Sequence, residues 1–575
     1  MAREPHNRWL HPQTMRALSL LSSRYTVANA ASRNTLHERS APMIQLTGDS
    51  LTIDDVVVVA RHGDSVAPYS AALVERMEVS RRWIAETIAS DTATVYGVNT
   101  GFGSLAQVRI RPDEARRLSR KFILTCLVGV GEPLPIEVVR AMLLLRANMF
   151  ARGNSGIRPE VATLLIEMLN RGVTPWVPAK GSLGASGDLA PLAHIAIVLT
   201  RDESEDGGYS GQAYFEGELV SGAEAMRRAG LERAVADAKE GLALTNGTTM
   251  MVALGALAVY DAEMIVRHAE IAAALSFEAL GALSSALHPA LHAANQQPGQ
   301  IGAAAHLRTL LDGSQHMDSD PTRVQDAYSI RCTPQVIGPA RDTLVFLRER
   351  FTAALNASSD NPLLVPDGDD GDDGDSDEMR AISGGNFHGQ GPSMWMDFLG
   401  IALSAVGNIA EPRIFRLVTP ELSNGLPAML APQSGLDSGL MMPQYTAAAL
   451  VSENKTLAHP DSVDSIPSCA NQEDHVSMGA NAARHAAEIV ANVRHIIAIE
   501  LLTAAQAIDL REDGPARLGR ATRAAYDVIR ERVAFLEHDR ETTPDIERLA
   551  ALMQSEDLLR AVARVAGEGG GVSDD

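Results

Sequence analysis

The sequence has few cysteines, and their spacing is not that of a disulfide-bonded protein. Only three occur in 575 residues, at Cys126, Cys332 and Cys469, and they are far apart. Disulfide scaffolds are small secreted proteins with paired cysteines at close spacing. We therefore exclude a disulfide framework and expect a protein of the reducing cytoplasm.

Long apolar runs are also missing. The longest, Met250 to Tyr260, stops at Asp261, and Glu263, Arg267 and Glu270 follow it at helical spacing. A helix needs about 20 predominantly apolar residues to cross a bilayer. The sequence therefore predicts no transmembrane segment and no membrane partner.

Lysine is scarce, and negative charge is in excess. Lysine occurs only at positions 121, 180, 239 and 455, and the net charge of the chain is -22 at pH 7. Such a charge opposes the binding of nucleic acids and anionic membranes unless a local basic patch overcomes it, and the sequence contains no such patch. We expect no nucleic-acid partner.

What the sequence does have is the composition of a large folded protein. Hydrophobic residues make up 45% and charged residues 21%, which is ordinary for a globular protein. Because 575 residues exceed the size of a single core, we expect several layers or domains that share long elements.

Composition divides the chain into five parts. Residues 1–42 carry six arginines against two glutamates and contain no signal-peptide core, so we expect a disordered extension. The other expected parts are an N-terminal region (43–245), a central long-helix bundle (246–510), C-terminal helices (511–566) and a disordered tail (567–575). The acidic run 367–378 is interpreted as a surface-loop insertion, because it lacks the terminal glutamate and the flanking helices of a calcium loop.

Hydrophobic periodicity predicts a mainly all-α fold. Shorter amphipathic helices are expected at about 70–90, 112–130, 135–150 and 158–170, and long helices rich in Ala, Leu, Ile and Met at about 246–287, 338–356, 392–416 and 475–509. Strand signals are few and short, and we expect a smaller N-terminal α+β region. Long helices around a shared core form a bundle in which side chains from several helices converge on one site.

The most informative segment is Gly-Ser-Leu-Gly-Ala-Ser-Gly-Asp-Leu-Ala-Pro-Leu at 181–192. One interpretation is a glycine-rich turn before a helix. The segment also suits a backbone reaction, because small residues let the Gly187 nitrogen approach the Ala185 carbonyl and close a five-membered ring. Loss of water from Ser186 then leaves an exocyclic methylene, which is an electrophile. A serine-hydrolase elbow requires G-x-S-x-G, and Asp188 stands at its fifth position.

This segment resembles that of the histidine/phenylalanine ammonia-lyase family, whose methylidene-imidazolone prosthetic group forms autocatalytically from Ala-Ser-Gly. Five further segments between about residues 43 and 510 carry the resemblance: Tyr96–Gly103, Glu240–Gly247, Gln325–Cys332, Gly384–His388 and Ser465–Met478. The resemblance implies a long-helix bundle of the fumarase/aspartase-like superfamily. It also implies a methylidene-imidazolone formed from Ala185, Ser186 and Gly187, and a homotetramer whose sites combine residues from different subunits.

The resemblance implies a role for each matched residue. Tyr96 corresponds to the base at the substrate β-carbon, a role that requires a lowered pKa. Arg331 corresponds to the arginine that holds the substrate carboxylate through two charge-assisted hydrogen bonds. The remaining matches are Asn246 beside the prosthetic group and the substrate, Gln325 and Tyr328 as residues that line and polarise it, and Phe387 as an aromatic wall.

Glu473 favours histidine as the substrate. The segment around it resembles the histidine-lyase form of this motif, in which a glutamate lies near the imidazole and the amine of the substrate. A carboxylate suits an imidazole, because a benzene ring would offer it no hydrogen bond. Met441 likewise matches a histidine-lyase pocket position. Cys126 departs from the pattern, because histidine lyases carry His where this chain has Cys126, in the neighbourhood that discriminates between rings.

We therefore expect an ammonia-lyase that converts L-histidine, a small-molecule amino-acid substrate, to trans-urocanate and ammonia. The alternatives are an aromatic amino-acid (Phe/Tyr) ammonia-lyase or a 2,3-aminomutase. A fumarase-like lyase without the prosthetic group and a non-catalytic scaffold are disfavoured by the intact Ala185-Ser186-Gly187. Neither a metal nor an external cofactor is expected, since His288 and His292 are four apart but are separated by Pro289 where a zinc-protease helix carries glutamate.

Overall fold

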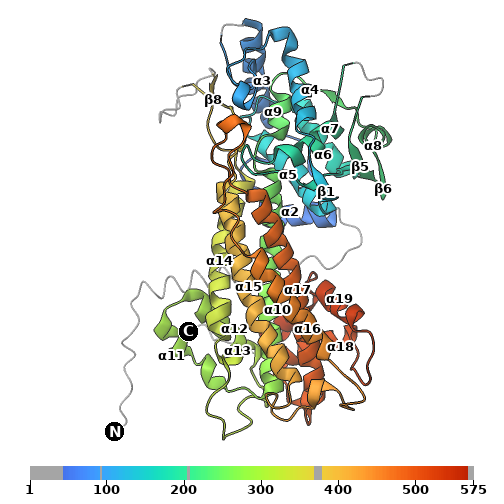
Figure 1. Ribbon diagram of the computed structural model, residues 1–575, viewed down its shortest axis with the longest axis vertical. Helices are drawn as coiled ribbons and strands as arrows, with labels where there is room; N and C mark the ends of the chain where they lie inside the picture. Colours follow the sequence, from blue (N-terminus) through green and yellow to red (C-terminus); the bar gives the residue numbers. More distant parts are fainter. Residues whose placement is uncertain (1–42, 91–92, 204–207, 368–378, 568–575) are drawn as a thin grey trace.

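The computed structural model describes residues 43–90, 93–203, 208–367 and 379–567. The predicted extension 1–42 and nearly all of the acidic insertion lie outside the described residues. Gly567, where the predicted tail begins, is the last residue of a helix, and the rest of the tail is not described. The molecule is elongated, with a bundle of long helices that carries the N-terminal region at one end and shorter helices around the other (Figure 1).

Five long helices form the bundle: α10 (Thr249–Leu280), α14 (Thr333–Leu355), α15 (Gln390–Val418), α16 (Met441–Leu457) and α17 (Gly479–Asp509). α15 packs against α17, α10 and α14, and α16 covers α15 and α17 from outside. α10 is buried on nearly all sides, as expected of a central helix that is apolar all round, whereas α16 buries only Pro443, Ala447 and Asn454.

Two of these helices, α10 and α15, are long and apolar enough to cross a membrane by length and composition. Within the protein, however, 83% and 61% of their most apolar windows are buried. Burial against neighbouring helices explains their apolar character, so we interpret both as core helices of the bundle.

The N-terminal region combines short helices with small sheets. Its helices are α2 (Ile53–Val57), the π-helical turn η1 (Val58–His62), α3 (Ala71–Ser90), α4 (Ala115–Thr125), α5 (Ile136–Ala151), α6 (Pro159–Arg171), α7 (Leu189–Leu199), α8 (Gly222–Arg228) and α9 (Glu240–Thr245). Its strands are β1 (Val130–Pro133), β2 (Thr174–Pro175), β3 (Pro178–Lys180), β4 (Thr200–Arg201), β5 (Gln212–Phe215), β6 (Glu218–Ser221) and β7 (Ala234–Val235).

The strands pair in small units rather than in one large sheet. The order β2-β5-β6 is antiparallel, with Thr174 opposite Tyr214 and Gln212 opposite Ser221. β1 pairs with β3 antiparallel and β4 with β7 parallel, while β8 (Leu363–Pro366) and β9 (Met379–Ile382) form a hairpin that flanks the acidic insertion. The prediction of a mainly α-helical bundle with a smaller α+β region is confirmed.

Shorter helices surround the far end of the bundle. They are α11 (Pro289–Asn295), α12 (Pro298–Leu310), α13 (Tyr328–Arg331), α18 (Arg520–Arg532), α19 (Thr543–Leu552) and α20 (Asp557–Gly567). Buried ion pairs hold the core, such as Arg413 of α15 with Glu500 of α17, whose side chains are both fully buried. The bundle is elongated, and its two ends carry different sets of loops (Figure 1).

Candidate active site

The Ala-Ser-Gly segment lies where the bundle meets the N-terminal region. The Gly184 carbonyl accepts hydrogen bonds from the Gly389 backbone N–H at 3.0 Å and from the Ser477 hydroxyl at 3.0 Å. Gly389 directly precedes α15, Ser477 lies two residues before α17, and Asp188 of the same loop contacts the first turn of α10. Three long helices therefore direct their N-termini, the positive ends of their dipoles, toward this loop.

Gly187 has no room for a side chain. Its φ is +74°, and a Cβ atom would lie 2.2 Å from the Gly247 carbonyl oxygen. Gly187 and Gly247 form a parallel backbone bridge, and the next residue, Asp188, donates its N–H to Gly247 O at 2.8 Å. The backbone around Ser186 is thus held in a tight turn that only glycine permits.

Asp188 fastens this turn to α10. Its fully buried carboxylate accepts hydrogen bonds from the backbone N–H groups of Met250 and Met251, at 2.8 and 3.1 Å, and from the Ser182 hydroxyl at 3.1 Å. Burial raises the pKa of Asp188 to about 6, and the hydrogen bonds and the Arg146 charge oppose that rise. The carboxylate acts as a cap on the first turn of the longest helix.

Asn246 faces the same turn from the other side. Its side-chain N–H donates to the Ser186 carbonyl at 2.9 Å, while its own carbonyl accepts from the buried Arg146 guanidinium at 2.7 Å. The Asn246 side-chain oxygen is buried and has no hydrogen-bond partner among the described residues. The small-residue turn, the donor on Ser186 O and this unpaired acceptor fit a prosthetic group formed from Ala185, Ser186 and Gly187.

Glu473 also contacts the segment. The Ser186 hydroxyl donates to Glu473 Oε1 at 2.8 Å across 287 positions of sequence. Two residues predicted from different motifs, one from the electrophile motif and one from the substrate motif, are therefore hydrogen-bonded to each other.

Tyr96 lies next to this pair. Its hydroxyl accepts the Gly103 backbone N–H at 3.2 Å. Burial raises the pKa of Tyr96; the Gly103 hydrogen bond opposes the rise, and the charges of Glu473 and Cys469 add to it. The described residues of a single chain therefore do not supply the lowered pKa that a base at the β-carbon requires.

Phe387 and Cys126 belong to the same end of the molecule. Phe387 is half-buried in the loop that precedes α15, two residues before the Gly389–Gly184 hydrogen bond. Cys126 ends α4, which packs on α7 and α9, and its thiol is buried. Burial raises the pKa of Cys126 to about 12, so the thiol is neutral at physiological pH.

The other predicted residues lie at the opposite end. Tyr328 and Arg331 form α13, and Ser329 between them accepts a hydrogen bond from Arg413 of α15. Arg413 is 24 residues beyond Gly389, which at 1.5 Å per helical residue places it about 35 Å from the Ala-Ser-Gly loop. Figure 1 shows α13 low in the bundle and α4 and α9 at its top.

Three of these distant residues form a local group. The Arg331 guanidinium stacks over the Tyr328 ring at 4.6 Å from its centroid. With its amide oxygen toward Arg331, Gln325 accepts from Nε at 3.0 Å. Tyr328 is 70% exposed, so the group faces outward and is open to another molecule.

Met441 lies at this far end too. It is the first residue of α16 and follows Leu440, whose backbone N–H donates to the Met429 carbonyl. The next carbonyl, that of Leu430, accepts a hydrogen bond from the Gln506 side chain near the end of α17. The structure thus brings together Tyr96, Ala185, Ser186, Gly187, Asn246 and Glu473, and it separates them from Gln325, Tyr328, Arg331 and Met441.

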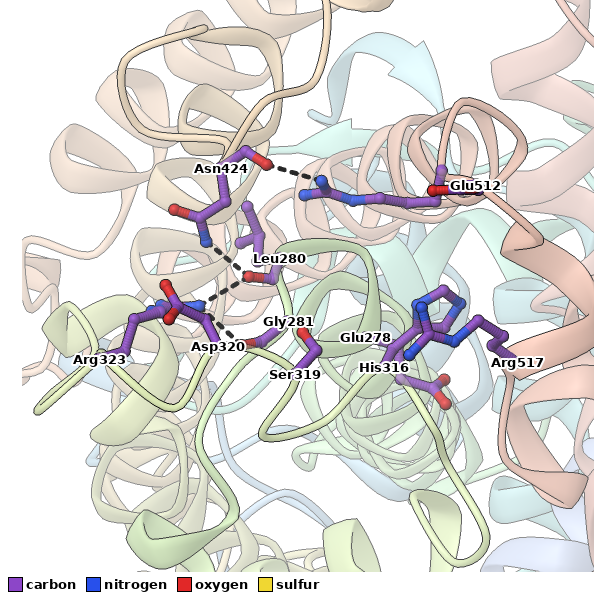
Figure 2. Close-up of a pocket in the computed structure, with 11 residues that line it drawn as sticks. Glu278, Leu280, Gly281, His316, Ser319, Asp320, Arg323, Asn424, Glu512 and Arg517 are labelled. Carbon is purple, nitrogen blue, oxygen red and sulfur yellow. Dashed lines mark hydrogen bonds between the residues drawn. The ribbon is translucent and has the colours of Figure 1, made fainter.

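A cavity of about 300 Å³ lies at the end of α10, and its lining includes Arg323, two residues before Gln325 (Figure 2). Arg323 donates to the Leu280 and Gly281 carbonyls at the end of α10, Asn424 donates to Leu280 O, and Arg511 donates to Asn424 O. The contacts on Leu280 O and Gly281 O, dashed in Figure 2, satisfy carbonyls at the end of α10, and the contact from Arg511 holds Asn424 in place. They brace the segment that leads into Gln325 and α13.

Two residues with close contacts to the site were not predicted as site residues. In the sequence, Asp188 stands out only as the residue that excludes a hydrolase elbow. Ser468 is one position of the segment Ser465–Met478, yet its hydroxyl donates to Glu473 Oε2 at 2.7 Å. The described residues contain no group of three or more His, Cys, Asp or Glu that could hold a metal ion.

Comparison with known proteins gives one family. The profile of the aromatic amino acid lyase family matches residues 51–531. A histidine ammonia-lyase of Symbiobacterium thermophilum is 50% identical over 522 residues, which cover 90% of this chain and 98% of that protein. A histidine ammonia-lyase of Treponema denticola is 46% identical over 523 residues, covering 91% of this chain and 99% of that protein.

Solved structures agree with this result. The crystal structure of a histidine ammonia-lyase from Trypanosoma cruzi superposes with a TM-score of 0.81 at 39% identity and covers 91% of this chain and 95% of that one. A tyrosine aminomutase from Streptomyces globisporus gives a TM-score of 0.81 at 35% identity and covers 91% of this chain and 99% of that one.

Proposed function

Because the chain belongs to the aromatic amino acid lyase family, we propose that it is an ammonia-lyase that converts L-histidine to trans-urocanate and ammonia. The observation that carries this proposal is the contact of Glu473 with Ser186, which puts a carboxylate beside the predicted electrophile. Relatives that are 44–50% identical over about 90% of the chain and bear the name histidine ammonia-lyase support the same substrate.

Ala185, Ser186 and Gly187 would supply the methylidene-imidazolone. When formed, this group offers an electrophilic carbon that bonds to the substrate and makes ammonia elimination possible. The tight turn at Gly187 supports ring closure, because it leaves the backbone no freedom to extend. Asn246, with its donor on Ser186 O and its unpaired buried oxygen, would hold the finished group.

The chain's other residues would bind and deprotonate the substrate. Tyr96 would remove the β-proton, and Arg331 would hold the substrate carboxylate with its two-pronged guanidinium. Glu473 would accept a hydrogen bond from the imidazole N–H; hydrogen bonds to charged groups contribute roughly 1.5–3 kcal/mol. Gln325, Tyr328, Phe387, Met441 and Cys126 would complete the pocket.

These roles require more than one copy of the chain. Arg331 lies about 35 Å along the bundle from Ser186, a distance that no side chain spans. A second copy packed antiparallel would bring its α13 to the Ala-Ser-Gly loop of the first. We therefore propose the homotetramer implied by the family resemblance.

Assembly would also address the pKa of Tyr96. Within one chain, burial and the Glu473 charge raise that pKa. A guanidinium from Arg331 of another copy would favour the phenolate and lower the pKa of Tyr96, as opposite charges do at short range.

The free cysteines Cys126, Cys332 and Cys469 support a cytoplasmic location, where thiols stay reduced.

The second candidate is an aromatic lyase or aminomutase. It is favoured by Cys126, which gives the pocket a neutral thiol in place of an imidazole, and by the likeness to tyrosine aminomutase. The deciding experiment offers histidine, phenylalanine and tyrosine in parallel to the purified enzyme and follows the ultraviolet absorbance of the products. Urocanate should form fastest. Faster release of cinnamate or coumarate, or recovery of a β-amino acid, would overturn the substrate assignment but not the family.

A further inference from the structure

The Glu473 carboxylate is held from two sides by hydroxyl groups. Ser186 donates to Oε1 at 2.8 Å, and Ser468 donates to Oε2 at 2.7 Å. Within the part of the chain that the structure describes, these are the only side-chain donors on this carboxylate. Each carboxylate oxygen therefore has one hydroxyl partner, and only one of the two hydroxyls would be lost in the proposed reaction.

The Ser186 hydroxyl is temporary under the proposed function. It leaves as water when the prosthetic group forms, so Glu473 Oε1 loses its only described partner. The Ser468 hydroxyl takes no part in that reaction and stays on Oε2. Formation of the electrophile would thus free one carboxylate oxygen for the substrate while the other remains held.

The backbone keeps Ser468 in place for this contact. Ser468 and Glu473 form an antiparallel bridge, with Ser468 N–H donating to Glu473 O at 2.9 Å. Between them Cys469, Ala470 and Asn471 all have left-handed φ values, from 50° to 68°. Non-glycine residues rarely adopt such values, and their clustering is typical of functional loops held by surrounding contacts.

Neighbouring groups are engaged elsewhere. The Tyr96 hydroxyl accepts from Gly103 N–H, and the Cys469 thiol accepts from Ser104 N–H at 3.3 Å. Neither donates to Glu473 in the described structure. Without Ser468, the carboxylate would be free to rotate about its last bond after Ser186 has lost its hydroxyl.

We propose that Ser468 is a positioning residue, whose hydroxyl fixes Glu473 Oε2 so that Oε1 faces the substrate once the electrophile has formed. This inference rests on the proposed function and deepens it. Ser468 acts through Glu473 and makes no contact of its own with the substrate.

The test is a double-mutant cycle on the full-length enzyme. Ser468→Ala, Glu473→Gln and the double variant are compared with wild type on whichever of histidine, phenylalanine and tyrosine the wild type deaminates fastest. Ser468→Ala should lower kcat about ten- to a hundred-fold with little change in KM, in line with one lost hydrogen bond to a charged group. In the Glu473→Gln background the same substitution should have little further effect.

Three controls separate positioning from folding. Intact mass should show that every variant has lost one water in ring closure and one from Ser186. Ser468→Thr keeps the hydroxyl and should restore most of the rate. Ser465→Ala is the matched loop control, because the Ser465 hydroxyl accepts from Val476 N–H, not from Glu473. Its effect on the rate should be the same in the wild-type chain and in the Glu473→Gln chain.

The outcomes are distinguishable. If wild type is active and Ser468→Ala matches its rate, or if the loss is equally large in the Glu473→Gln background, the positioning role is wrong and the proposed function stands. The role would also be overturned if Ser468→Thr failed to recover activity although its intact mass showed the loss of both waters. If wild type releases ammonia from none of the three amino acids, the proposed function falls, and this inference falls with it.

Discussion

At the scale of single residues, the hydroxyl of Ser186 is the atom on which the proposed chemistry depends. It is hydrogen-bonded to Glu473, and its neighbours Ala185 and Gly187 are buried in a turn closed by Gly247. Because the hydroxyl contributes one hydrogen bond to folding, its removal should affect stability far less than it affects turnover.

Ser186→Ala should therefore fold and assemble normally and lose activity by at least about 10³-fold, the scale reached when a central group of an active site is removed. Alanine has no hydroxyl to eliminate and cannot give the methylene. Intact mass, thermal unfolding and ammonia release together check this expectation. Turnover at the wild-type rate in a chain that has not lost the second water would contradict the mechanism.

Cys126 offers a second prediction at this scale. Its buried thiol is neutral and provides only a weak hydrogen bond, so a water molecule is able to take its place beside the ring. Cys126→His should preserve or improve the kcat/KM for histidine relative to phenylalanine and tyrosine. Cys126→Ser, which introduces no imidazole, is the matched control. A selective loss of histidine turnover in the His variant, with the fold intact, would show that Cys126 is itself part of the specificity.

Motif residues could be assigned from the sequence because each stands in a segment with a recognisable order. Ser468 could not be assigned in the same way. Its contact with Glu473, five positions away, depends on three successive left-handed residues that no local pattern predicts. Asp188 shows the same limit, because its partners Met250 and Met251 are more than sixty positions away.

At the scale of elements, the long central helices were the most predictable part of the fold. α10, α15 and α17 occur close to the expected ranges because alanine- and leucine-rich sequences with helical periodicity favour buried helices. α14 was predicted from residue 338 but begins at Thr333 and continues through Pro339. α16 was not predicted, because it lies on the outside and buries only three residues, so its sequence carries no apolar stripe.

Close packing between two of these helices gives a stability prediction. A Cβ atom on Gly255 of α10 would lie 2.0 Å from the Phe351 ring of α14, which in turn packs edge-on against Trp395 of α15. Gly255→Ala should therefore lower stability: overpacking costs about 1–3 kcal/mol, more than the roughly 1 kcal/mol of improved helix propensity.

A second helical glycine provides the control. At Gly302 of α12, the nearest atom to a Cβ belongs to the Arg341 guanidinium, at 3.4 Å, which is an ordinary van der Waals distance. Gly302→Ala should raise stability by up to about 1 kcal/mol. Unfolding midpoints at equal protein concentration compare the two variants with wild type. If both substitutions moved the unfolding midpoint equally and in the same direction, the α10–α14 contact would not limit the size of the side chain at position 255.

At the scale of the whole molecule, the predicted site residues form two groups at opposite ends of the bundle. Tyr96, Ser186 and Glu473 meet at one end, while the half-buried Arg331 lies near the other, about 35 Å away along α15. The family resemblance predicted sites that combine residues from different subunits, but it did not say which residues lie at which end of the bundle; that appears only when the chain is folded. Under the proposed function, a complete site then requires one end of the bundle from one copy of the chain and the opposite end from another.

Mixed assemblies test this division directly. Tyr96→Phe and Arg331→Met chains, each inactive alone, are co-expressed with different affinity tags, and oligomers that contain both are purified in two steps. If a site takes Tyr96 from one copy and Arg331 from another, random assembly in equal amounts leaves both residues intact in about one quarter of the sites. The mixed oligomer should then recover about that share of wild-type activity. If one chain built a whole site by itself, every site would lack one of the two residues, and the mixture would stay as inactive as its parents.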